Sequence, residues 1–557
     1  MAKLEQLAVM VVAANPSART HLRSTLDSFG MRDVQFVSSA TAAIHKLRDE
    51  RYDLILSEHD LGDDAQDGQH LLEDLRAHHI IPRSTVFIMI SGERSTERVV
   101  GTAELAPDDY VLKPFTAGIL QARIERAIQR RDAFLPVFKL LEEERIDQAM
   151  KACEQAEARY PSWRADFLRL RADMALQRNQ FELADALYRE ALKSGNAPWA
   201  RLGLARVLIA THRLDEATPL LEALIAESEH YLEAYDLLAQ CHRQSGASSE
   251  ACQTLNEAVR RSPRRLGRLR QFGALATRAG EYGQAEQALQ QLVHLGKRSE
   301  FRDPTDHVEL ARVQILQRNI KEAAATVQDL ERNMGSLPAA KVCAALGKAM
   351  LFRETGDEAA ARASAAAAAA ALADADNIPL SIKHEIVRAC LANGLDQQGG
   401  EIVSDILRHA PDEQTIRETR ELLAEQGRKD LSEQVEEKMH AEVRNYVALG
   451  ARKAQAGDYG GAVAEMMVAV RRMPGNPHVL FNASLALLRH IEHAGWNERM
   501  AEEARALIAR TRKVDPTNPK LDALGSFMAG LERKYGMQPH MPGAASPTAG
   551  TGATRKS

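Results

Sequence analysis

The sequence has few aromatic residues, no apolar run of membrane length and little surplus charge. Phe, Trp and Tyr together make up 5% of 557 residues, and the formal net charge is −5. So small a charge gives no electrostatic reason to expect nucleic acid or a membrane surface as a partner. The N-terminal apolar run, 7–14, lacks a basic leader and is far shorter than the roughly 18–20 residues of a membrane span. These absences predict a soluble, cytoplasmic protein without a membrane span.

Cysteine is also scarce, at five residues with no CxxC spacing. Dispersed thiols in odd number suit a reducing compartment better than disulfides or zinc. The motifs GxxxxGK[ST], GxSxG and HExxH are missing as well. His490 and His493 have helical i, i+3 spacing, for which an exposed helix face is preferred over a metal site. We therefore expect no catalytic residue, no metal site and no enzymatic activity.

The first quarter of the chain alternates short β-branched runs with helical stretches. Such alternation predicts a parallel sheet covered by helices on both faces, with any site at the carboxyl ends of the strands. The predicted strands are 7–12, 34–38, 52–57, 85–90 and 109–113, and the predicted helices are 16–29, 40–50, 67–79, 93–104 and 116–131.

Three motifs at these strand ends resemble the receiver domain of two-component response regulators. They are YDLILSEHDLGDD, FIMISGE and DDYVLKPF. The resemblance covers residues 1–131 and implies a flavodoxin-like α/β domain with a five-stranded parallel sheet. It also implies four roles: Ser91 as the hydroxyl that senses the phosphoryl group, Tyr110 as the rotating aromatic switch, Lys113 as the ammonium beside the acceptor, and Pro114 as a proline that usually follows a cis bond.

Two positions depart from the family pattern. The acid pair that binds the metal falls on Ala13 and Ala14, and the phospho-accepting aspartate falls on Glu58. Mg²⁺ needs oxygen ligands that alanine cannot supply, so we expect Mg²⁺ binding, and with it any cofactor, to be lost. Glu58 carries its carboxylate one methylene further out than aspartate would, so Lys113 should pair with it without a ligand.

The residues leave other interpretations open at this pocket. Asp60 is a second candidate acceptor, disfavoured because it lies beyond the strand end. The acids Asp63, Asp64 and Asp67 are interpreted as a solvated loop rather than a replacement metal site. A receiver fold kept only as a packing module is the alternative to the favoured hypothesis, a protein-binding pseudo-receiver.

From about residue 135 the strand pattern ends and helices follow one another. Alanines of a recurring motif, at 149, 184, 217, 251 and 285, are separated by 35, 33, 34 and 34 residues. This period resembles tetratricopeptide repeats (TPRs), helix–turn–helix units that stack into a superhelix. We therefore expect an all-α TPR-type solenoid over 132–536 and a disordered tail over 537–557. The clearest copies are 164–197, 198–231, 232–265, 266–297 and 443–476, whereas 340–440 fits poorly.

In the TPR family the first helix of each repeat lines a concave groove. The positions that match this groove are Arg169, Trp199, Arg206, Arg243, Arg270 and Arg278. Because arginine binds carboxylates through two hydrogen bonds, these residues predict a preference for an acidic or C-terminal segment of a partner. A charged, solvated surface is the alternative.

The combined pattern predicts a non-enzymatic adaptor in a phosphorelay. The pseudo-receiver would dock onto a histidine kinase or another response regulator, while the TPR array binds a second protein. DNA is not expected as a partner, because no helix-turn-helix or basic domain follows the receiver. The alternative is a phosphorylation-responsive regulator that uses an unconventional acceptor and has the array as its output.

Overall fold

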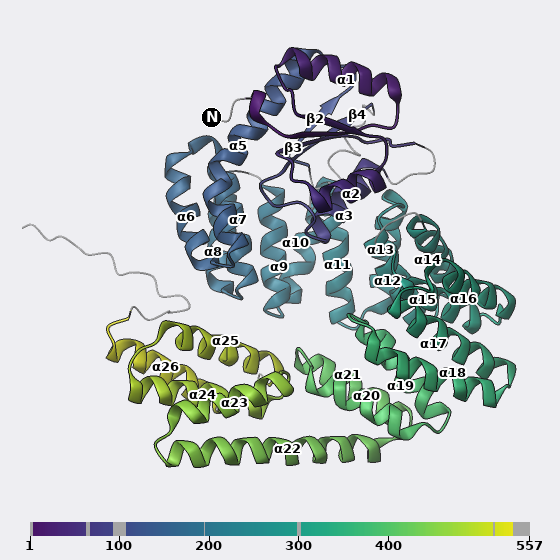
Figure 1. Cartoon of the computed structure of the whole chain (residues 1–557), viewed down its shortest axis with the longest axis vertical. Coiled ribbons are helices and arrows are strands. Elements are labelled where there is room, and N and C mark those ends of the chain that lie inside the picture. Colours follow the sequence, from purple (N-terminus) through teal and green to yellow (C-terminus); the bar gives the residue numbers. More distant parts are fainter. Residues whose placement is uncertain are drawn as a thin grey trace, which may run out of the picture. The chain divides into compact units, whose positions relative to one another are not determined.

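The computed structural model describes residues 4–62, 67–92, 107–193, 195, 197–297, 302–515 and 518–537 (Figure 1). Two compact units divide the chain at Asp303 and Pro304, and each is described by itself. The predicted helix 93–104 and the predicted tail from residue 538 onward lie outside the described residues. The boundary between the units falls within the stretch KRSEFRDPTD, residues 297–306.

A five-stranded parallel sheet opens the first unit, as predicted. Its strand order is β2-β1-β3-β4-β5, and hydrophobic clusters form a core on each face. The register aligns the carboxyl ends of the strands, which brings separate parts of the sequence to one edge. The strands are β1 (Val9–Val12), β2 (Val34–Val37), β3 (Leu54–Glu58), β4 (Val86–Ser91) and β5 (Asp109–Leu112), and the first three helices are α1 (Pro16–Ser28), α2 (Ala40–Asp49) and α3 (Gly68–Ala77).

The last helix of this domain, α5 (Ala117–Glu142), runs without a break past residue 131 into the helical array. Proline inside a helix normally kinks or ends it, and Pro136 lies within α5. Buried side chains continue the helix all the same: Phe134 stacks on Phe167 of the array with 3.8 Å between ring centroids. The boundary expected at residues 131 and 132 therefore falls inside a helix.

The rest of the first unit consists of helices packed in succession, as Figure 1 shows. Small residues allow the close approaches between them. A Cβ on Gly203 would lie 2.2 Å from the ring of Tyr188, so only glycine fits there. The helices are α6 (Ile146–Arg159), α7 (Arg164–Gln177), α8 (Phe181–Lys193), α9 (Pro198–Ala210), α10 (Leu214–Glu227), α11 (Leu232–Gln244), α12 (Ser248–Arg261), α13 (Leu266–Arg278) and α14 (Tyr282–Gly296).

The second unit continues the same architecture. Its alanine-rich helix α18 packs along α17 and buries Ala361, Ala365 and Ala368, so it is an ordinary second helix of a pair. None of the helices in the described ranges is long and apolar enough to cross a membrane. The helices are α15 (Pro304–Leu316), α16 (Ile320–Met334), α17 (Pro338–Thr355), α18 (Glu358–Ala371), α19 (Leu380–Ala392), α20 (Asp396–Arg408), α21 (Glu413–Glu425), α22 (Lys429–Gln455), α23 (Tyr459–Arg472), α24 (Pro477–Ala494), α25 (Glu498–Val514) and α26 (Leu521–Lys534).

A left-handed residue marks the turn between the two helices of successive pairs. The spacing of these residues is 33 to 35 from Glu144 to Gly280, and 38 in each of the next three steps. The 38-residue steps end at Gly394 and explain why the first half of 340–440 fitted a 34-residue pattern poorly; the two steps that follow are 33 and 30 residues. These turn residues, all with positive φ, are Glu144, Asn179, His212, Gly246, Gly280, Arg318, Gly356, Gly394, Gly427 and Gly457.

Candidate functional site

The carboxyl edge of the sheet gathers the residues that the sequence motifs singled out. Glu58 ends β3 and Ser91 ends β4, and both are almost fully buried. Lys113 follows β5, and its backbone N–H donates to the carbonyl of Ser91 at 2.7 Å. The Lys113–Pro114 peptide bond is cis, as the resemblance implied, and Tyr110 lies half-buried in β5. The edge therefore assembles the predicted pocket from three strands.

An ion pair links the two charged residues of this edge. The Nζ of Lys113 donates a hydrogen bond to Oε1 of Glu58. The Glu58 side chain is 7% exposed and the Lys113 side chain is 39% exposed. The carboxylate at the acceptor position therefore has a cationic partner within the chain, as expected from the extra methylene of glutamate.

The end of β1 differs from the ends of β3 and β5 in the residues that it contributes to the edge. Ala13 and Ala14 have methyl groups instead of carboxylates there, and Ala13 is packed in the hydrophobic core. Nη1 of Arg19 donates to both of their carbonyl oxygens at 2.7 Å. Mg²⁺ requires near-octahedral oxygen ligands, and carboxylates are the ligands that usually hold it. A guanidinium, two methyl groups and a carboxylate already paired with Lys113 do not fit that ion. Sequence reasoning missed Arg19, although its place in the first turns of α1, next to the strand end, was an available signal.

The predicted groove residues lie on the first helices of successive pairs, α7, α9, α11 and α13. The structure brings two of them together, since the guanidinium of Arg169 lies 5.8 Å from the ring centroid of Trp199. Three of the arginines already face carboxylates, whereas Arg243 and Arg278 are exposed at the ends of their helices. The three pairs are Arg169–Asp173 at 3.9 Å, Arg206–Glu233 at 3.7 Å and Arg270–Asp303 at 3.8 Å. The positive charge of the groove is thus partly compensated within the chain.

Two family models match the chain. Residues 9–125 match the response regulator receiver domain. The N-terminal domain is a response regulator receiver. Residues 210–292 match the family described as anaphase-promoting complex, cyclosome, subunit 3, and the helical pairs form a TPR-like solenoid. The fold class predicted from the sequence is confirmed.

Curated relatives match over the receiver. The transcriptional activator protein IrlR of Burkholderia pseudomallei is 32% identical over 125 residues, 22% of this chain and 52% of its own. The transcriptional regulatory protein KdpE of Staphylococcus aureus is 31% identical over 121 residues, 22% of this chain and 49% of its own. The chain therefore spans about half the length of the curated relatives that it matches. A tetratricopeptide repeat protein from Parabacteroides merdae is a structural neighbour with 12% identity and a TM-score of 0.31, covering 46% of this chain and 97% of its own.

The acids around the receiver pocket differ in their surroundings. Asp60 is exposed, and its side chain accepts the backbone N–H of Gly62 at 2.9 Å. The interpretation of Asp67 as part of a solvated loop is wrong: its side chain is 12% exposed, accepts the N–H of His70 at 2.8 Å and caps α3. Capping places Asp67 at the N-terminus of α3, and its contacts with the side chains of His70 and Arg264 are the physical reason for the burial. Residues 63 and 64 lie outside the described residues.

Asp67 and His70 also connect the receiver to the solenoid within the first unit. His70 bonds to Asp67 through Nδ1 at 2.8 Å and to the carbonyl oxygen of Arg264 through Nε2. Burial favours the neutral ring, but the hydrogen bond to Asp67 and its charge outweigh burial and raise the pKa of His70 to about 9. Gly68 lies between this pair and the pocket, since a Cβ there would meet the carbonyl oxygen of Glu58 at 2.3 Å. Contacts thus run from Glu58 through the backbone of Gly68 and the side chain of His70 to the α12–α13 loop.

The sequence RRSPRRLGRLR, residues 260–270, is a basic run that suggests positive surface potential, but one of its arginines is buried. Arg268 is 1% exposed and forms two hydrogen bonds of 2.8 Å with the carboxylate of Asp236. This buried pair joins α11 to α13. Arg268 therefore stabilises the packing of the solenoid, and only part of the basic run contributes to surface potential.

Proposed function

We propose that this protein is a non-enzymatic signalling adaptor of a two-component phosphorelay. Its receiver accepts no phosphoryl group, and its TPR-like solenoid binds a partner protein. The observation that supports this function best is the ion pair between Glu58 and Lys113, next to a strand end where Ala13 and Ala14 replace carboxylates.

Three requirements of phosphoryl transfer are affected in this pocket. Transfer needs a divalent cation to neutralise the phosphoryl oxygens, and Ala13 and Ala14 supply no ligand for one. The carboxylate of Glu58 extends one methylene beyond the position of an aspartate, which alters the in-line geometry. Lys113, which would contact the phosphoryl group, is already paired with Glu58. The proposal therefore includes the loss of Mg²⁺ binding.

Proteins are the partners that this architecture suits. The receiver docks onto a histidine kinase or another response regulator, and the solenoid holds a second protein. Arg243 and Arg278 are the groove arginines best placed to meet an acidic or C-terminal segment, because both are exposed.

Acetyl phosphate with Mg²⁺ provides the direct test. The full-length protein should keep its mass, and Glu58→Asp alone should stay unreactive because it restores an acceptor without its cation. The triple variant Ala13→Asp, Ala14→Asp and Glu58→Asp should gain one phosphoryl group only when Mg²⁺ is present. This variant is also the positive control, since Ser91, Tyr110 and Lys113 remain in place.

Phosphorylation of the unmodified protein would contradict the proposal. Modification at Asp60, detected by peptide mapping after trapping of the acyl phosphate, would instead favour a phosphorylation-responsive regulator with an unconventional acceptor. Mg²⁺ binding by the unmodified protein in a titration would contradict it as well.

A further inference from the structure

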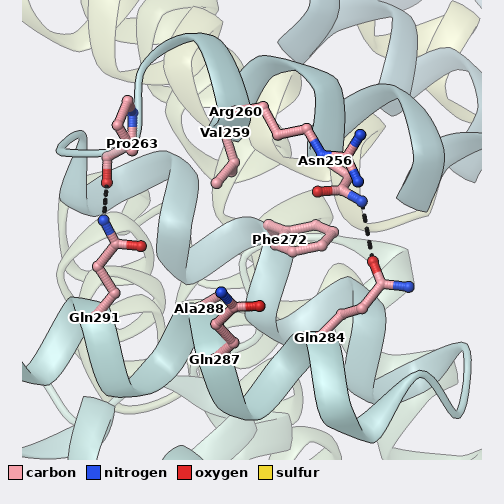
Figure 2. Close-up of a pocket in the computed structure, with 9 residues that line it drawn as sticks. All are labelled: Asn256, Val259, Arg260, Pro263, Phe272, Gln284, Gln287, Ala288 and Gln291. Carbon is pink, nitrogen blue, oxygen red and sulfur yellow. Dashed lines mark hydrogen bonds between the residues drawn. The ribbon is translucent and has the colours of Figure 1, made fainter.

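A pocket of about 390 Å³ lies between the second helices α12 and α14 of neighbouring repeats (Figure 2). Ligand pockets in proteins usually have volumes of about 300–1,000 Å³. Phe272 of α13 is 3% exposed and forms the floor, so the ring supplies an apolar base rather than an open stacking face. The lining residues are Asn256, Val259, Arg260, Pro263, Phe272, Gln284, Gln287, Ala288 and Gln291.

Carboxamide side chains surround this apolar floor. Gln284, Gln287 and Gln291 follow i, i+3, i+7 spacing along one face of α14, and Asn256 faces them from α12. Two hydrogen bonds hold part of the lining in place: Asn256 Nδ2 donates to Gln284 Oε1 at 3.0 Å, and Gln291 Nε2 donates to the carbonyl of Pro263 at 2.8 Å (Figure 2). A carboxamide has both a donor and an acceptor, so it matches the N–H and C=O groups of an extended peptide.

One cationic side chain lines the pocket. Arg260 is the only charged residue among the nine described lining residues, and within the described part of the chain it has no ion pair or hydrogen bond. The neighbouring Arg261 differs, because it pairs with Glu229 at 3.5 Å and Glu257 at 3.4 Å. Glu281 lies outside the lining and accepts from Gln284 Nε2 at 3.3 Å. Arg260 is therefore available to bind a carboxylate from outside.

We propose that this pocket binds an extended acidic peptide segment of a partner protein. Gln287 and the carboxamide oxygens of Asn256 and Gln291 would pair with the peptide backbone, a small apolar side chain would rest on Phe272, and Arg260 would bind an Asp or Glu carboxylate. The inference rests on the proposed protein-binding role of the solenoid and gives that role a surface on the second helices. This surface is distinct from the arginine positions on the first helices.

Selection from a phage-displayed library of random 12-residue peptides tests the proposal on the full-length protein. Enriched sequences should contain Asp or Glu, and synthetic copies should bind in fluorescence polarisation. Replacing their acids by Asn or Gln should weaken binding about tenfold, and so should Arg260→Glu, because a charge-assisted hydrogen bond is lost. Gln287→Leu should weaken binding about fivefold. All of these protein changes are at exposed positions, so folding is retained.

The matched control is Arg332→Glu, the same charge reversal at an exposed arginine of the second helix α16. Its affinity should stay within about twofold of the parent protein, because Arg332 lies outside the pocket lining. Peptide binding that is retained in Arg260→Glu but lost in Arg243→Glu would contradict the assignment of the peptide to this pocket and would leave the protein-binding role of the solenoid intact. Displacement of the peptide by ATP but not by glutamate would indicate that the pocket binds a nucleotide, and this would also contradict the proposal of a peptide site. A library without any enriched peptide would contradict the pocket and the protein-binding role together.

Discussion

Replacing Glu58 by glutamine tests whether the Glu58–Lys113 pair holds the receiver pocket together. The change keeps the size of the side chain and removes only its charge. Glutamine can still accept a hydrogen bond from Lys113, so the variant isolates the ionic part of the interaction.

The expected loss is about 1 kcal/mol. A hydrogen bond between charged groups contributes roughly 1.5–3 kcal/mol, and a neutral one about 0.5–1.5 kcal/mol. The Glu58 side chain is 7% exposed, but Lys113 is 39% exposed and can turn toward water, which reduces the difference. About 1 kcal/mol corresponds to a roughly fivefold increase in the local opening equilibrium.

Hydrogen–deuterium exchange of the full-length protein measures this local effect. The amides of His59 and Lys113, which bond to the carbonyls of Ile90 and Ser91, should exchange about fivefold faster in Glu58→Gln. Asp60→Asn is the control, since Asp60 is exposed and lies two residues after Glu58, beyond the end of β3. Unchanged exchange at both amides, or an equal increase in the control, would refute the reasoning.

Two further predictions concern pH and packing. The contact between His70 and the carbonyl of Arg264 should be fully stabilising below about pH 6.5 and should be lost as the pH rises through about 9, because the pKa of His70 is raised in the folded protein. The protection of the α3 amides against hydrogen exchange, corrected for the intrinsic rate at each pH, should fall over this range. The variant His70→Ala should remove this pH dependence of the protection. Gly203→Ala should lower the free energy of unfolding of the first unit by about 1–3 kcal/mol, measured by thermal denaturation, because its Cβ would lie 2.2 Å from the ring of Tyr188. Gly267→Ala is the control, since nothing lies within 4 Å of its Cβ, and an equal effect there would contradict the packing argument.

The sequence predicted the receiver well because its signals are local. Each strand is a short apolar run, and a motif marks the ends of β3, β4 and β5, so Glu58, Ser91 and Lys113 could be placed at one edge from the register of a parallel sheet. Arg19 and Asp67 were missed or misread for the opposite reason. Their roles depend on which backbone groups their side chains reach, and spacing along the chain does not encode that reach.

The solenoid was predicted best in its first copies, where the period stays near 34 residues. Alanines spaced near 34 residues marked the first copies, but the 38-residue steps from Gly280 to Gly394 removed the match. The buried pair of Arg268 and Asp236 was hidden in another way, because a basic run in sequence indicates surface charge and the pairing partner is 32 residues away. Long-range packing decided which arginine of that run is exposed and which is buried.

The continuity of α5 affects how a receiver of this kind would communicate with its solenoid. A helix of 26 residues is about 39 Å long, and α5 belongs to both domains. Lys113 precedes this helix by four residues, and its ammonium is held by Glu58 on β3. Under the proposed function no phosphoryl group arrives to change that pair, so a partner that binds the receiver must act on it directly. Such a partner would then influence the solenoid through α5 and through the contact between His70 and the α12–α13 loop, rather than through phosphorylation.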